Sequence, residues 1–506
     1  MKCVAILVAA SLAGPALGQT TRVWGGSTGI WSNGPSWVGG TIPSDPSQSA
    51  QLGGLGVYSV NCDIGASIGA LYVDNPNATL LLNSNNTFVV SHAPTCRLSG
   101  TIQLIGGTAN PPYLRFDQNT TLTRTVDGPS LITMGYPGNT LMAAVGTGPG
   151  ATLTIGAPFT IRGHGRVFGS VVNAGVLSGT SGPLVLDALT YVTSGNGVID
   201  TGSGYVTLSG GSYTNPRLTS SSSTFIELRD NVLLINPDIT GHMFIAANST
   251  AQFAGSTITL HNGDYGGYDP SSSVFNSSVT ITGTGRFGGS STHNLTVAGG
   301  RTLTLGPNIQ LDIPQGTITG NIQPQGRFSS RSAMVAGTVS MSSTTATWLL
   351  IDTPPAVNAQ SGPRITGTAV WNLDGTLHIV TGSPGITTDI GSEWAIITGS
   401  QINGQFSAVF LPPQVISPIS KWNVRYEPTR VLITIDCLAD VTNLGGRGRP
   451  DGAVTIDDLI AYLDAFFTNK YGIADVTGFG GSGGPDNQLT SDDLVKFLQV
   501  FFANCT

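Results

Sequence analysis

Charged side chains are scarce in this chain of 506 residues. Asp, Glu, Lys and Arg make up 10% of it, against about 25% in ordinary globular proteins. No lysine occurs between Lys2 and Lys421, and no basic stripe is present that could follow a nucleic-acid backbone. The composition therefore excludes nucleic acid as a partner.

Long apolar runs are also missing. The stretch Val4–Leu12 is too short to span a bilayer, and no later run reaches about 18 residues. This stretch follows Lys2 and precedes the small-residue sequence Ala16-Leu17-Gly18, a pattern typical of a secretory signal. We expect residues 1–18 to be a signal peptide and the mature protein to be secreted without a membrane span. An uncleaved N-terminal anchor is the alternative.

Only four cysteines remain once Cys3 leaves with the signal, and four cysteines allow three connectivities. Cys437 and Cys505 bracket the last 70 residues, so we predict a disulfide between them that staples a small domain. By elimination, Cys62 pairs with Cys96. No CxxC pair is present, so the cysteines do not suggest zinc.

Helical periodicity is almost absent from residues 19–436. Short apolar stretches such as Ala78–Leu82 and Leu303–Leu305 alternate with Gly- and Asn-bearing turns, which is typical of β-strands. With 69 glycines the segment also resembles low-complexity sequence. The regular return of Val, Ile, Leu and Phe argues against disorder.

The spacing of the turns favours a solenoid over a sandwich or a propeller. The segment from Ile161 to Ser170, IRGHGRVFGS, has an echo from Ile281 to Ser290, ITGTGRFGGS. A strand, a Gly or Asn corner and another strand are what each coil of a parallel β-helix needs, because corner residues take φ > 0. We predict a mainly β chain whose core is a right-handed parallel β-helix.

Both ends of the predicted solenoid carry distinctive sequence. Trp24, Trp31 and Trp37 lie in an N-terminal segment that resembles the entry segment of bacterial surface β-helix proteins of the autotransporter-associated repeat type. We expect these rings to plug the open first coil, and an aromatic platform for sugars is the alternative. Near-alternating stretches over 372–436 predict antiparallel strands that form a C-terminal cap, which leaves the solenoid to residues 19–371.

The sequence shows no recognisable catalyst. A glycosidase needs two carboxylates set across a sugar ring, and the 16 aspartates of residues 19–436 are spread thinly. The densest polar stretch, His261–Asp269, is more typical of a solvated turn. The six histidines show no metal-ligand spacing. We therefore expect no enzymatic activity.

The last 70 residues repeat with a spacing of 35, which indicates one small unit used twice. Polar residues of calcium-ligand type recur in register, and an apolar run at helical spacing follows each set. The paired polar positions are Asp440 and Asp475, Thr442 and Thr477, Asp451 and Asp486, Thr455 and Thr490, and Asp458 and Asp493. The sequence therefore predicts an oxygen-rich loop before an amphipathic helix, twice.

Calcium-loop spacing assigns a ligand role to most of these positions. In the first half we predict Asp440, Thr442, Asp451, the carbonyl of Ala453, Thr455 and Asp458. In the second half we predict Asp475, Thr477, Asp486, Gln488, Thr490 and Asp493. Capping boxes at Thr455 and Thr490 are the alternative, and they explain Asp458 and Asp493 without metal. They do not explain the four upstream aspartates.

The duplicated loop–helix pattern resembles a dockerin, and the flanking cysteines suggest the variant found at the C-termini of exported planctomycete proteins. The resemblance covers residues 437–506 only. Each loop has seven extra residues, 444–450 and 479–485, which depart from the family pattern. The resemblance implies a Ca²⁺-ordered module that docks onto a cohesin-like anchoring protein through its helices, at a bacterial cell surface.

The helices also suggest where a partner binds. If Leu459, Leu463, Phe466 and their repeat mates enter the core, the remaining aromatic and polar positions face outward. We predict partner contacts at Tyr462, Lys496, Phe497 and Gln499. The leading hypothesis is a non-enzymatic surface or matrix protein attached by its tail. The rivals are a polysaccharide-active β-helix enzyme and a carbohydrate-binding protein carried by the same module.

Overall fold

The computed structural model describes most of the chain, and the following statements concern those residues alone. They are residues 19–83, 85–106, 110–135, 143–289, 292–351, 365–381, 390, 392–412, 420–442, 453–477 and 488–503. The predicted signal peptide, the extra loop residues and Asp451, Asp486 and Cys505 lie outside them. The chain divides into two compact units, Met1–Gln252 and Phe253–Thr506.

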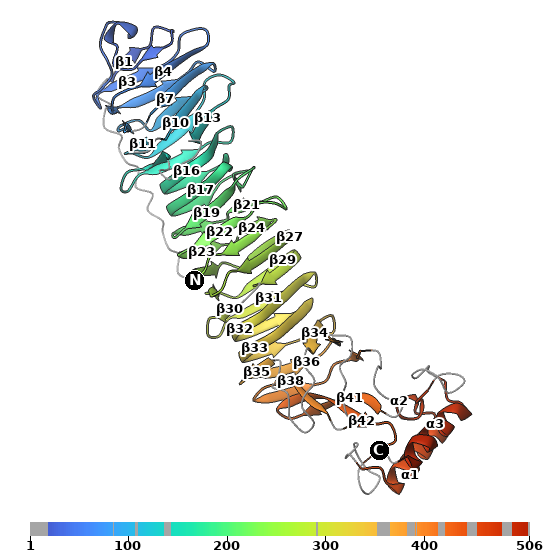
Figure 1. Cartoon of the computed structure of the whole chain (residues 1–506). Coiled ribbons are helices and arrows are strands. Elements are labelled where there is room, and N and C mark those ends of the chain that lie inside the picture. Colours follow the sequence, from blue (N-terminus) through green and yellow to red (C-terminus); the bar gives the residue numbers. More distant parts are fainter. Residues whose placement is uncertain are drawn as a thin grey trace, which may run out of the picture. The chain divides into compact units, whose positions relative to one another are not determined.

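The first unit is a stack of parallel strands that pair from coil to coil in three columns (Figure 1). The first column contains β2 (Gly29–Ile30), β4 (Tyr58–Cys62), β7 (Ala78–Leu82), β10 (Thr101–Ile105), β13 (Leu131–Gly135), β18 (Val198–Asp200), β21 (Arg217–Thr219) and β24 (Asp238–Thr240). The second contains β5 (Ala66–Ile68), β8 (Thr87–Val90), β11 (Tyr113–Phe116), β14 (Ala143–Thr147), β19 (Tyr205–Ser209), β22 (Ile226–Arg229) and β25 (Met243–Ile245). The third contains β1 (Thr20–Val23), β3 (Gln48–Gln51), β6 (Ala70–Val73), β9 (Thr95–Leu98), β12 (Thr120–Thr123), β15 (Thr152–Ile155), β20 (Ser212–Thr214), β23 (Asn231–Ile235) and β26 (Thr250–Ala254).

Two long strands, β16 (Thr160–Asn173) and β17 (Val176–Thr193), run through all three columns. Their corners need glycine: a Cβ on Gly163, at φ 128°, would lie 1.7 Å from the Met134 carbonyl oxygen. In the echo segment, a Cβ on Gly283, at φ 91°, would lie 2.0 Å from the Leu260 carbonyl oxygen. Asparagine serves elsewhere, as at Asn215 with φ 50°. The predicted Gly and Asn corners are confirmed.

Alternation within each strand builds the core of the first unit. In-register pairing stacks one aliphatic side chain per coil, and all of them are buried: Val60, Leu80, Ile102, Ile132, Ile161, Leu177, Ile199, Leu218 and Ile239. Each buried Val, Leu or Ile contributes about 1.5–3 kcal/mol. A parallel, solenoid-like β-structure therefore holds together without helices, as the sequence predicts.

The three tryptophans of the N-terminal segment form one cluster at the first coil. Trp24, Trp31 and Trp37 are all buried, and their rings meet edge to face at 4.8 and 5.0 Å. The indole N–H groups of Trp24, Trp31 and Trp37 donate to backbone carbonyls. The rings are therefore packed inside the first coil, and buried rings leave no platform for sugars.

The second unit, taken by itself, also pairs its strands in parallel, and its C-terminal end differs. Its parallel strands are β27 (Thr257–Gly267), β28 (Ser271–Phe275), β29 (Val279–Gly288), β30 (His293–Val297), β31 (Thr302–Leu305), β32 (Ile309–Pro324), β33 (Arg327–Ser340), β34 (Ala346–Ile351), β35 (Ile365–Gly367), β36 (Val370–Leu373), β37 (Thr376–Thr381), β38 (Glu393–Thr398), β39 (Gln401–Gly404) and β40 (Ala408–Phe410). Among the described strands of this unit, β42 (Arg430–Cys437) pairs antiparallel with β38 and β41 (Ser420–Glu427).

The prediction of antiparallel strands over 372–436 is thus wrong for its first part. Strands β37 and β40 pair in parallel, as do β36 and β39. A strand with one buried face alternates in the same way whatever the direction of its neighbour. The cap is the β41–β42 hairpin, and the parallel coils extend to Phe410.

Short helices follow the hairpin: α1 (Ile456–Phe467), α2 (Tyr471–Ala474) and α3 (Ser491–Phe502). None of the helices in the described part of the chain is long and apolar enough to cross a membrane.

Candidate functional site in the C-terminal segment

Both long helices, α1 and α3, begin with the same N-terminal capping motif. Thr455 precedes α1 and Thr490 precedes α3, each in extended backbone, and each forms a capping box with the aspartate three residues later. The box satisfies backbone N–H groups that the first helical turn leaves without partners. The alternative prediction of capping boxes is therefore confirmed in both halves.

The two box aspartates also tie the upstream segment to the helix. The N–H groups of Val441 and Thr442 both donate to Asp458 Oδ1 at 2.8 Å. The N–H and Oγ1 of Thr455 donate to Asp458 Oδ2 at 2.8 and 3.1 Å. A carboxylate offers about four acceptor positions, so Asp458, which is buried, is saturated.

The second half repeats this geometry. Val476 and Thr477 donate their N–H groups to Asp493 Oδ1 at 2.9 Å, and Thr490 donates to Oδ2 at 2.8 and 3.1 Å. We call Asp458 and Asp493 with these donors the carboxylate staples. Because all four acceptor positions are taken, neither carboxylate can also close a metal site without losing amide bonds.

The upstream ligand positions are placed differently. Asp440, Thr442, Asp475 and Thr477 are all buried. The Oγ1 atom of Thr477 is a buried oxygen without a hydrogen-bond partner, which is unusual in a folded protein. Buried oxygens of this kind fit a hard cation such as Ca²⁺.

The other predicted ligands contribute less. Ala453 and Gln488 are exposed, and Thr455 and Thr490 serve the staples. Within the described ranges, no group of three or more His, Cys, Asp or Glu side chains is gathered closely enough to hold a metal ion. The structure therefore supports the upstream pairs and the capping role, and it leaves the full ligand sets as a prediction.

Acidic groups set the electrostatics here. Burial lowers the pKa of Lys421 on β41. The carboxylates of Asp436, Asp440 and Asp458 oppose this shift, because they stabilise the ammonium. In the second half, burial and then the carboxylates of Asp493 and Asp475 raise the pKa of Tyr462. Acidic groups of the first half thus act on Lys421 of β41, whereas acidic groups of the second half act on the Tyr462 phenol.

The predicted partner contacts Tyr462 and Phe497 are wrong. Both are 0% exposed, and their rings stack at 3.7 Å with an interplanar angle of 9°. They form the centre of the tail's core, where the Tyr462 hydroxyl donates to the Ala474 carbonyl. Lys496 is half-buried and Gln499 is exposed.

The helices expose other apolar positions instead. Ile460 and its repeat mate Val495 are exposed, and Phe467 and Phe502 are 75% and 77% exposed. The sequence prediction missed them because it assigned the wrong face of each helix to the core. Helix α1 buries Asp458, Tyr462 and Ala465, whereas Leu459 and Phe466 are only partly buried. Identical spacing of exposed apolar residues in both copies is the signal that finds them.

The cysteine predictions have mixed outcomes. Cys437 is disulfide-bonded, and its predicted partner Cys505 lies outside the described residues. Cys62 and Cys96 are free and buried, so the predicted bridge between them is wrong. Cys62 belongs to the first column of strands and Cys96 to the third, and their thiols donate separately to the Ile64 and Leu71 carbonyls.

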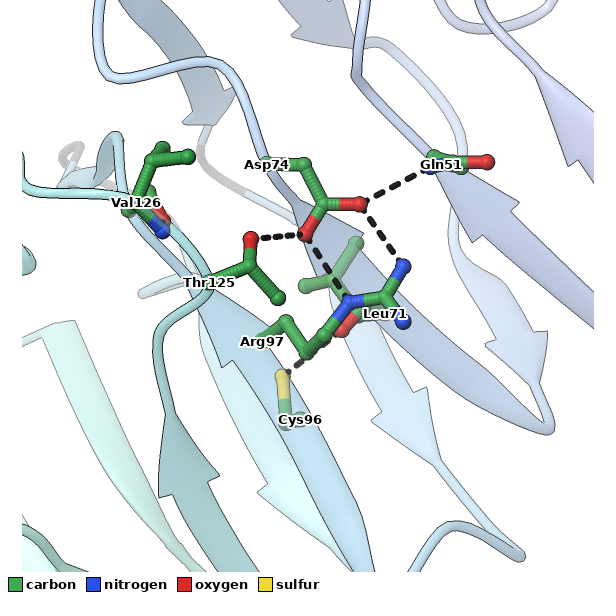
Figure 2. A network of polar contacts seen from close by, with 8 residues as sticks. Gln51, Leu71, Asp74, Cys96, Arg97, Thr125 and Val126 are labelled. Atoms are coloured by element: carbon green, nitrogen blue, oxygen red, sulfur yellow. Dashed lines mark hydrogen bonds and ion pairs between the residues drawn. The ribbon is translucent and has the colours of Figure 1, made fainter.

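The described coils carry several ion pairs between charged side chains. Figure 2 shows one of them, in which Asp74 accepts from Arg97 Nε and Nη2 at 2.9 and 2.7 Å and from Gln51 and Thr125. The Arg97 guanidinium also lies 3.9 Å from the centre of the Tyr72 ring. These bonds link residues of successive coils, so the cluster joins neighbouring coils.

Comparison of the chain with models of known protein families, with curated proteins and with solved structures finds no match.

Proposed function

We propose that the protein is a non-enzymatic, exported surface or matrix protein whose dockerin-like tail attaches a right-handed β-helix to a cohesin-like partner. The observation that carries this proposal is the duplicated set of exposed apolar residues on α1 and α3. The Tyr462–Phe497 stack fills the core of the tail, so the exposed apolar residues of α1 and α3 are not needed for folding. Exposed apolar patches of this kind are typical of interaction sites. Right-handed winding is the sense that parallel crossovers take almost always.

The proposed docking surface consists of Ile460, Phe467, Val495 and Phe502. Replacing Phe467 and Phe502 together with Ser is expected to release the protein from the cell or matrix fraction into the medium. A buried aromatic anchor contributes about 2 kcal/mol or more to an interface, or roughly thirtyfold in affinity. Fractionation followed by immunoblotting measures the release.

Leu55 of the first unit, 96% exposed, provides the matched control, and its replacement with Ser is expected to leave retention unchanged. Deleting the residues after Cys437 is expected to release the protein as fully as the double variant. A truncated chain that stays bound would place attachment in the solenoid and overturn the proposal.

The same proposal includes Ca²⁺. Asp440 and Thr442 in the first half, and Asp475 and Thr477 in the second, would supply buried oxygens, with Asp451 and Asp486 completing each set. The bound ion would neutralise the clustered carboxylates, while the carboxylate staples hold the loop backbone against the helix. The buried, unpartnered Thr477 Oγ1 supports this division of roles.

Calorimetric titration of the full chain with Ca²⁺ is expected to give a binding heat at millimolar concentration or below. The heat should disappear in the Asp440→Asn, Asp475→Asn double variant, because both halves lose a buried charged ligand. Asp464, an exposed acid on α1 that pairs with Lys470 at 3.0 Å, is the control: Asp464→Asn should titrate like the parent. Absence of heat in the parent chain would show that caps and staples alone order the tail.

A further inference from the structure

A hollow of 460 Å³ opens on the outside of the first unit. Tyr113, Arg166, Phe168 and Asp187 line it, together with residues 147–151, 169 and 170. Its volume falls within the range of small-molecule sites, about 300–1,000 Å³.

Glycine makes room for the Phe168 ring. The parallel register places Gly146 of β14 beside Phe168 of β16. A Cβ on Gly146 would lie 2.5 Å from Phe168 Cγ and 2.6 Å from Cδ1. One side of the ring therefore rests on bare backbone, and the other borders the hollow.

Both rings are available to a ligand. Neither Tyr113 nor Phe168 contacts another ring or a cation among the described residues, and Tyr113 is 38% exposed. The outward rings of the second unit differ: His378 is stacked between Trp348 at 4.3 Å and Phe410 at 4.5 Å. Arg327 covers the other face of Trp348 at 4.5 Å. The Trp348, His378 and Phe410 rings are thus stacked on one another, whereas no ring or cation among the described residues lies on Tyr113 or Phe168.

The polar side of the hollow carries no net charge. Arg166 and Asp187 form an ion pair, so the guanidinium is already neutralised and an anionic ligand would meet the carboxylate. The pair still offers N–H donors and carboxylate acceptors at one point. A neutral ligand that has hydroxyl groups at its edge and an apolar face satisfies both the pair and the rings.

We propose that this hollow binds a neutral sugar residue of an extracellular polysaccharide. The apolar C–H face of the sugar would lie on Phe168 and Tyr113, and its hydroxyl groups would bond to Arg166 and Asp187. The proposal concerns the solenoid alone, so it holds whether or not the tail is an attachment module.

The test titrates the full chain calorimetrically with hexasaccharides of glucose, xylose and mannose, and with hexagalacturonate as the acidic counterpart. At least one neutral hexasaccharide is expected to bind. Phe168→Ala and Tyr113→Ala should each weaken that binding about tenfold, which corresponds to an aromatic contact of about 1.4 kcal/mol. Phe410→Ala, an exposed aromatic change in the second unit, should leave the affinity unchanged.

Tyr113→Ala keeps the test valid if Phe168→Ala perturbs β16, since Tyr113 is a surface side chain. Three results would each overturn the proposal: no binding of any neutral hexasaccharide at millimolar concentration, binding that Tyr113→Ala leaves intact, or tighter binding of hexagalacturonate than of every neutral probe.

Discussion

Replacing Asp458 with Asn is expected to melt the helical tail even when a chelator removes all calcium. The carboxylate accepts four hydrogen bonds, three of them from backbone N–H groups. The Asn amide would present its NH₂ to two of these donors and leave them buried without an acceptor. Losing a buried, charged acceptor of this kind costs roughly 3–5 kcal/mol, a large share of the stability of a small domain. Hydrogen exchange of the α1 and α3 amides measures the loss.

The neighbouring Asp457→Asn variant is the matched control. Asp457 lies in the same first turn, so its replacement removes a similar helix-dipole interaction, worth about 0.3–1 kcal/mol. Asp493→Asn should behave like Asp458→Asn, because the second half repeats the geometry. If chelator-treated parent protein exchanges as fast as the Asp458→Asn variant, the carboxylate does not hold the tail without metal and the staple interpretation is wrong.

The second unit is expected to lose about 3 kcal/mol of stability as the pH falls from 6.5 to 4. His293 is buried between Ser271 Oγ, 2.9 Å from Nδ1, and Ser273 Oγ, 3.0 Å from Nε2. Tyr265 completes the chain through a 2.6 Å bond to Ser273. These neighbours are uncharged, so burial lowers the pKa of His293 to about 4.

The sign follows from linkage. Below its ordinary pKa of 6.5 the unfolded chain binds a proton that the folded chain does not, so stability falls with pH until the folded group titrates near 4. Burial also lowers the pKa of His378, which acts in the same direction. Hydrogen exchange of β28 and β30 across this range measures the effect. The His293→Gln variant should flatten the dependence, and an unchanged slope in that variant would contradict the assignment.

The solenoid was predictable because each coil repeats the same short sequence pattern of strand and corner. One aliphatic residue per coil, as in the column from Val60 to Ile239, and corners such as Gly163 are visible in sequence alone. Strand direction is not, since the pattern around His378 is the same for parallel and antiparallel neighbours. Parallel coils therefore replaced the expected cap there.

The candidate site was predictable in part. The 35-residue spacing located both loop–helix copies and both capping boxes. It did not show that Val441 and Thr442 would donate to Asp458, because those bonds depend on how the chain returns to the helix. It also misassigned Tyr462 and Phe497. Sequence alone does not distinguish an aromatic side chain that binds a partner from one that packs in the core, and here the stacking of the two rings decides between them. The Cys62–Cys96 pairing failed because elimination ignores which column each strand joins.

The two free thiols give the first unit a built-in reporter of its own opening. Burial raises the pKa of both Cys62 and Cys96 to about 12, so neither reacts as a thiolate while its coil is closed. Cys62 lies on β4 in the first column, where β4 pairs with β7, and Cys96 lies on β9 in the third column, where β9 pairs with β6 and β12. The labelling rates of the two cysteines therefore time the opening of two separate columns within one folded chain, with no probe added to the sequence.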